Sequence, residues 1–184
     1  MDPHLLSVAI SVPVDLDHEH TERLTRIVER LGFTAVSARH ERDHGVVHAN
    51  DPREVARVRA DLPKGESLLV SVPISIGRTR SEALARADLE PRFAGDHHPE
   101  QTGIFGAFEE AQDQVLALAR AGADGLVLDI PLERDVADVL AQIRALVVGA
   151  APRLRDAGPS ERSQVAPTVF YADGWTPPEG YDEP

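Results

Sequence analysis

Short apolar runs rich in β-branched residues alternate with stretches of helical period along most of this chain. Four such runs are predicted strands, at residues 5–14, 33–38, 68–76 and 126–130. Between them, apolar residues recur at the i, i+3, i+4, i+7 spacing of one helix face. The first such set is Leu24, Ile27, Val28 and Leu31. This alternation predicts an α/β fold whose strands pair in parallel through right-handed crossovers.

Capping residues mark where the helices begin and end. Asp51 before Pro52 is a helix start, because Asp can cap and proline suits the first helical position. Thr79 with Glu82 three residues later forms a capping box. Gly32 stands where a glycine ends a helix. Beyond the first helix, these signals predict helices at about 52–62, 79–89, 108–122 and 133–147.

The apolar centres of three predicted strands define the expected core. We expect them to lie in adjacent parallel strands, because their runs are the most apolar in the chain. They are Val8, Ile10, Val70, Val72, Leu126 and Leu128.

Composition narrows the classes of partner and compartment. The chain has no cysteine, which excludes disulfides, thiolate metal sites and a cysteine nucleophile and suits a reducing compartment. Its net charge of −12 repels nucleic acid and anionic lipid, so we expect neither as a partner. The N-terminal apolar run is too short to span a bilayer and lacks the basic leader of a signal peptide. We therefore expect a cytoplasmic protein.

Four stretches resemble the luciferase-like monooxygenases, the flavin- or deazaflavin-dependent enzymes related to bacterial luciferase. Residues 71–83 (SVPISIGRTRSEA) are similar to a late strand, turn and T-x-x-E-A helix start of that family. Residues 103–111 (GIFGAFEEA) and 121–128 (AGADGLVL) resemble its last helix and strand. Residues 30–40 (RLGFTAVSARH) are similar to its second strand. The order and spacing of these motifs in one chain carry the resemblance.

The resemblance implies a shortened barrel. The family builds an eight-stranded (β/α) barrel, a fold that typically needs about 250 residues, whereas this chain has 184. We therefore expect a partial (β/α) TIM-barrel-like fold of about four parallel strands with flanking helices, with the middle of the barrel missing between His44 and Asp51. The domain is expected to span 1–149. Residues 150–184 are expected to form an acidic tail rich in Pro and Gly that holds aromatic residues.

The resemblance also implies a flavin, either FMN or the deazaflavin coenzyme F420; the alternative is that the chain holds no cofactor. Gly103, Gly106 and Ala107 precede a helix, where free N–H groups suit a cofactor phosphate. Phe108 departs from the proline usual there, and the next two residues are glutamates. The alternative is an ordinary loop-to-helix turn whose carboxylates complement the helix dipole.

Charged residues after two strands would lie at the rim of such a barrel, where sites in this fold occur. Arg78 and Arg80 follow the third predicted strand and are candidates to bind a phosphate or an acidic substrate, or else form a solvated rim. Asp15, Asp17 and His20 follow the first strand in the same way, and helix capping by Asp17 accounts for part of that cluster.

His40 and His44 are the candidate catalytic residues, for proton transfer or substrate binding at the barrel mouth. With Glu41 they match H-E-x-x-H, which leaves a zinc-dependent hydrolase as a minor alternative. The context argues against a helix there, since Gly45 and two valines follow at once, so we predict no metal site. Polar loop histidines without a function are the remaining alternative.

The sequence leaves two functions open. One is a flavin- or deazaflavin-dependent oxidoreductase or monooxygenase; the other is a non-catalytic binding or partner subunit derived from that family. A half-barrel would expose Val, Ile and Leu of its strands on the inner face, so we expect a homodimer or a complex with another luciferase-like subunit. A small-molecule ligand fits either function.

Overall fold

The computed structural model describes residues 6–37, 46–93, 103–132 and 136–155 of the chain. Its strands are β1 (Ser7–Val12), β2 (Thr34–Ser37), β3 (Val46–His48), β4 (Leu69–Gly77), β5 (Ile104–Ala107) and β6 (Gly125–Asp129). Its helices are α1 (His18–Arg30), α2 (Pro52–Asp61), α3 (Arg80–Asp88), α4 (Phe108–Arg120), α5 (Val136–Arg155) and the 3-10 turn η2 (Pro91–Phe93). The predicted fold class is confirmed: a parallel sheet flanked by helices, in a partial barrel-like α/β fold.

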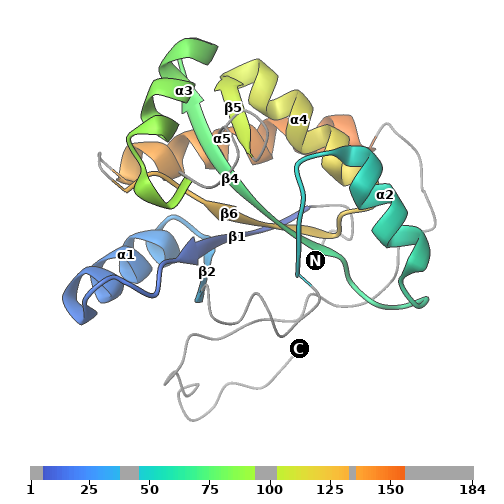
Figure 1. Cartoon of the computed structure of the whole chain (residues 1–184), viewed down its shortest axis with the longest axis horizontal. Coiled ribbons are helices and arrows are strands. Elements are labelled where there is room, and N and C mark those ends of the chain that lie inside the picture. The colour runs from blue at the N-terminus through green and yellow to red at the C-terminus, as the bar shows by residue number, and fades with distance from the viewer. Residues whose placement is uncertain (1–5, 38–45, 94–102, 133–135, 156–184) are drawn as a thin grey trace.

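The strands form one parallel sheet in the order β2-β1-β6-β4-β3, with β5 against the second half of β4. In Figure 1, β4 crosses the middle of the molecule and ends beside α3 and β5. The expected placement of the core residues in adjacent parallel strands is confirmed. Val8 of β1 and Val70 of β4 both lie opposite Leu126 of β6. Ile10 and Val72 both lie opposite Leu128.

The structure differs from the predicted elements at three places. Two short strands were missed: β3 begins two residues after His44, and β5 directly precedes the helix predicted at 108–122. The sheet therefore has six strands in the described residues, where about four were expected. The last helix runs on to Arg155, and Ala150 is buried, so the first residues of the predicted tail belong to the domain.

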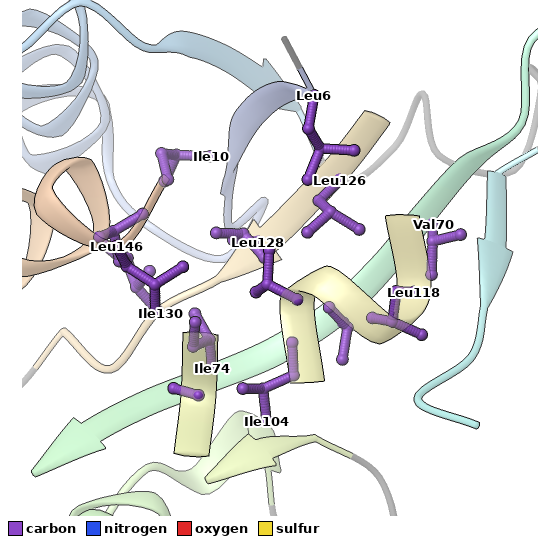
Figure 2. Packing of buried hydrophobic residues seen from close by; sticks show 14 of the residues in the cluster. Leu6, Ile10, Val70, Ile74, Ile104, Leu118, Leu126, Leu128, Ile130 and Leu146 are labelled. Atoms are coloured by element: carbon purple, nitrogen blue, oxygen red, sulfur yellow. The ribbon is translucent and has the colours of Figure 1, made fainter. Parts of the chain in front are cut away.

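Large aliphatic side chains occupy one face of the sheet and meet a layer of helices. Alternate residues of a strand point to one face, and Ile10, Val72 and Leu128 share this face and are buried. They belong to one cluster with residues of α1, α4 and α5, part of which Figure 2 shows. Within the layer, α5 contacts α1 and α4, and α4 contacts α2. This helix layer buries the apolar surface of the sheet.

The centre of the second face of the sheet carries mainly small and hydroxyl-bearing residues, which corrects an expectation. Its central positions are Ser11, Ser71, Ser75, Gly125 and Val127, each almost fully buried. A half-barrel exposing Val, Ile and Leu on this face was expected. That expectation is wrong for the central strands, because Ile10, Val72 and Leu128 point to the helix layer and Val127, which points to this face, is buried. The register and the alternation of side chains explain the correction.

Helix α3 and η2 lie on this second face, at the β4–β5 side. Phe105 alternates with Ile104 along β5, so its ring points away from the helix layer. It packs in a separate small cluster with Ala87 of α3 and Phe93 of η2. The two phenyl rings have centroids 6.0 Å apart.

Candidate functional site

The carboxyl ends of the parallel strands meet at one edge of the sheet, where α/β proteins place their sites. Four of the predicted site residues lie at this carboxyl edge. Arg78 and Arg80 follow β4, while Gly106 and Ala107 end β5. Gly103 lies just before β5, at the end of the strand opposite to Gly106 and Ala107.

The N-terminus of α4, predicted to hold a cofactor phosphate, already has an acceptor. The backbone N–H of Ala107 donates to Glu110 Oε2 at 3.0 Å. A Cβ atom added at Gly106 would lie 2.7 Å from that same oxygen, so the carboxylate fills the space above the glycine. Glu109 adds a second carboxylate to the first turn of the helix. An anion bound here would have to displace Glu110 and lie beside Glu109.

The cofactor implied by the resemblance therefore does not fit the residues of its expected phosphate site. A phosphate needs free N–H donors at a helix N-terminus, and here the chain's own carboxylate uses one of them. Two acidic side chains in the same turn add charge repulsion. We derive no flavin chemistry from this site.

Gly103 has a packing reason to be glycine. A Cβ atom at this position would approach the carbonyl oxygen of Pro73 to 2.8 Å. Gly103 and Arg80 do share the lining of a small pocket of about 230 Å³, with Asn50 and Gln114 as its other polar residues. This volume is below the range of typical ligand sites.

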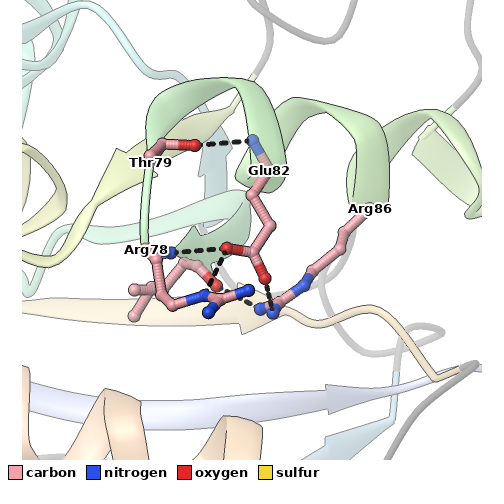
Figure 3. Close-up of polar contacts among 5 residues, drawn as sticks. Arg78, Thr79, Glu82 and Arg86 are labelled. Atoms are coloured by element: carbon pink, nitrogen blue, oxygen red, sulfur yellow. Dashed lines mark hydrogen bonds and ion pairs between the residues drawn. The ribbon is translucent and has the colours of Figure 1, made fainter.

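Arg78 is engaged in an ion-pair network at the start of α3, which Figure 3 shows. Its backbone N–H and its Nε both donate to Glu82 Oε2, at 3.0 and 3.2 Å. Arg86 pairs with the other oxygen of Glu82 and donates to the carbonyl of Ile76 at 2.6 Å. The Arg78 backbone N–H is the main cause that lowers the pKa of Glu82. This network holds α3 to the end of β4.

A second network closes the edge between β4 and β6. Glu90 is 4% exposed; its Oε1 accepts from Arg92 Nε at 2.8 Å and its Oε2 from the backbone N–H of Leu132 at 2.9 Å. Arg92 also donates to the carbonyl of Ile130 at 2.6 Å. The loop after β4 leads to α3 on one face, whereas the loop after β6 leads to α5 on the other. Such a divergence is where ligands bind in open α/β sheets, and here Glu90 and Arg92 occupy it.

The histidine predictions fall mostly outside what the structure describes. His40 and His44, the candidate catalytic residues, lie outside the described residues. His48 lies in strand β3, so a helix that aligns all three histidines does not exist. Within the described ranges, no group of three or more His, Cys, Asp or Glu side chains could hold a metal ion.

A pocket with a volume of about 490 Å³ lies between α1 and α5 in the described part of the chain. It opens at the carboxyl edge, where β1 leads into α1 and β6 leads into α5. Its lining is mostly aliphatic, with one histidine and one arginine. The residues are Leu16, His20, Arg23, Leu24, Ile27, Leu132, Val136 and Ala137. We call this the α1–α5 pocket.

His20, which lines this pocket, contacts the residue that caps α1. Its Nδ1 lies 2.8 Å from both carboxylate oxygens of Asp17. The backbone N–H of His20 donates to the same carboxylate at 2.9 Å and is the main cause that lowers the pKa of Asp17. The predicted role of Asp17 as a helix cap is thus confirmed.

Comparison with known proteins places the chain in no family. No protein-family model matches it, and no curated protein matches it. The luciferase-like resemblance therefore stays a prediction that rests on the quoted motifs.

Sequence reasoning missed the α1–α5 pocket, although one signal for it was present. His20 and Arg23 stand on the same helical stripe as Leu24 and Ile27, at i, i+3, i+4 and i+7. The apolar members of the stripe by themselves predict a core-facing surface. Two polar residues on an apolar stripe indicate that its N-terminal end does not enter the core.

Proposed function

We propose that this chain is a non-catalytic binding protein with a luciferase-like ancestry, which binds a small molecule without a flavin. The single observation that carries the proposal is the contact of Glu110 with the N–H of Ala107. It places a carboxylate where the family resemblance calls for the cofactor phosphate. The second function predicted from the sequence, a binding or partner subunit, is the one that the geometry favours.

Charge supports this proposal. Like charges a few ångströms apart disfavour one another by about 1 kcal/mol or more near a protein surface. A doubly charged phosphate at the α4 N-terminus would meet Glu109 and Glu110 in a protein of net charge −12. The helix dipole, about half a positive charge at that end, is already compensated by these two carboxylates.

The rest of the carboxyl edge also supports binding without catalysis. Glu82 and Glu90, the carboxylates beside α3 and η2, are bound to arginines. Neither is left as a general base, because a carboxylate held by hydrogen bonds to cations has a lowered pKa and a weakened basicity. The open volume lies instead in the α1–α5 pocket, within the size range of small-molecule sites.

Equilibrium titration with FMN and with F420-type deazaflavin tests the proposal. We expect no stoichiometric binding to the wild-type chain, judged by the visible absorption spectrum of the protein separated from free flavin. A Glu109→Gln, Glu110→Gln double variant should bind FMN at least about tenfold more tightly, since both repulsive charges are gone. Stoichiometric binding by the wild type would overturn the proposal. No gain in the double variant would show that Glu110 is not the obstacle.

The expected homodimer or luciferase-like partner subunit, and the expected cytoplasmic location, remain predictions. In the described residues, no helix is long and apolar enough to cross a membrane. The exposed apolar inner face that led us to expect a homodimer is absent from the described residues. The proposed function is therefore stated for a single chain in the cytoplasm. Light scattering decides the oligomeric state, because a dimer has twice the 20.0 kDa mass of one chain.

A further inference from the structure

The walls of the α1–α5 pocket are mainly aliphatic and therefore favour a ligand with an apolar part. Leu24 belongs to the buried core, and Leu16, Ile27, Leu132 and Val136 pack against that core while lining the pocket. Aliphatic walls around an open volume lack the contacts that a packed interior makes on all sides. An apolar group that enters the pocket regains those contacts and removes the walls from water.

Arg23 places a positive charge on this apolar lining. Its guanidinium makes no hydrogen bond or ion pair with any other residue of the described chain. Arg26, three residues further along the same helix, shows the contrast: its Nη2 pairs with Glu22 Oε2 at 2.6 Å. Arg26 takes no part in the pocket lining, while Arg23 does. A guanidinium offers a forked pair of donors that fits a carboxylate.

His20 supplies a second polar group beside Arg23. Its Nδ1 contacts the carboxylate of Asp17, which leaves Nε2 as the ring nitrogen that can meet a ligand. One histidine and one arginine thus stand one helical turn apart on a wall that is otherwise aliphatic. Pockets for small ligands combine apolar walls with a few polar groups of this kind.

We infer that the α1–α5 pocket binds an organic acid with an apolar body, an aliphatic or aryl carboxylate. Its hydrocarbon part lies against Leu24, Ile27 and Val136, and its carboxylate pairs with Arg23. The inference deepens the proposed binding function and rests on it. It assigns the class of ligand.

Calorimetric titration of the full chain with octanoate at neutral pH tests this inference. Octanamide has the same chain without the charge, and acetate has the charge without the chain. We expect saturable binding of octanoate at one site per chain and at least about tenfold weaker binding of both controls. Equal binding of octanamide would overturn carboxylate recognition, and no octanoate binding would overturn the whole inference.

Three variants locate the site. Arg23→Gln should weaken octanoate binding at least about tenfold while leaving octanamide unchanged. Ala137→Leu, at an exposed position of the lining, should fill the pocket and abolish octanoate binding without affecting folding. Arg26→Gln is the matched control and should bind octanoate like the wild type. An equal loss in Arg23→Gln and Arg26→Gln would show unspecific attraction and contradict the assigned site.

The outcome is separable from that of the proposed function. If the chain binds neither flavin nor octanoate, only the ligand class fails. If it binds FMN stoichiometrically, the proposed function fails, whatever octanoate does.

Discussion

The carboxyl edge of the sheet has one part beside α3 and α4 and another beside α1. The two parts differ in whether their charged side chains have partners within the chain. Beside α3 and α4, Glu82, Glu90 and Glu110 each accept hydrogen bonds from arginines or from backbone N–H groups of the same chain. We call this the closed end. Beside α1, the α1–α5 pocket stays open and Arg23 lacks a counter-charge within the described structure.

The difference distinguishes polar groups that stabilise the fold from polar groups that are left to bind a ligand. Polar groups at the closed end satisfy each other, so a ligand there would have to replace existing bonds and gains little. At the α1–α5 pocket, a ligand supplies contacts that the chain does not make for itself. A cluster of charges thus indicates a site only where some of its members lack partners.

The largest effect on folding is expected at Glu90. Glu90→Ala should lower the free energy of unfolding by about 3 kcal/mol, because it leaves Arg92 and the Leu132 N–H without their acceptor. Urea denaturation measures this loss. The exposed pair of Glu54 and Arg57, 3.7 Å apart, is the control, and Glu54→Ala should cost less than about 0.5 kcal/mol. Similar losses in both variants would mean that the closed end is no stronger than an exposed ion pair.

The pH dependence of the free energy of unfolding tests the hydrogen bonds of Glu90 a second time, and the expected change is smaller. Burial raises the pKa of Glu90, but the hydrogen bonds from Arg92 and the Leu132 N–H outweigh burial, and its pKa is lowered in the folded chain. A lowered folded pKa stabilises the fold fully above the unfolded pKa of about 4.3, and this contribution is lost as the pH falls through the folded value.

The wild type should therefore lose its advantage over Glu90→Gln as the pH falls below about 4.3. Both proteins share all other acidic groups, so their difference isolates Glu90. Urea midpoints of the two proteins between neutral and acid pH measure it. A difference that stays constant over this range contradicts the assigned bonding of Glu90.

Much of the fold could be predicted from local sequence because local physics decides it. The caps Asp51 and Thr79 accept backbone N–H groups as expected. Gly32 and Gly122 follow their helices with φ of 82° and 111°, a conformation that glycine adopts at little cost. Strand β5 was missed because Gly103 and Gly106 flank and interrupt it, and a short strand with two glycines looks like a turn.

The candidate site was less predictable, for two different reasons. Glu110 stands at the third position of α4, where a carboxylate commonly accepts the N–H of the cap residue. Its contact with Ala107 was therefore predictable from the sequence. The α1–α5 pocket was not, because it depends on how α5 packs beside α1 across more than a hundred residues. The face to which each strand residue points also needed the register of β1, β4 and β6.

Amide chemical-shift mapping compares the two parts of the edge most directly. In a nitrogen-labelled sample of the full chain, octanoate should shift the amide signals of Leu24, Ile27 and Ala137 and leave Ala107 and Phe108 in place. FMN added to the same sample should shift none of these signals. Saturable FMN-induced shifts at Gly106 and Ala107 in the wild-type chain would contradict the account, because they would show that a phosphate displaces Glu110 from the α4 N-terminus.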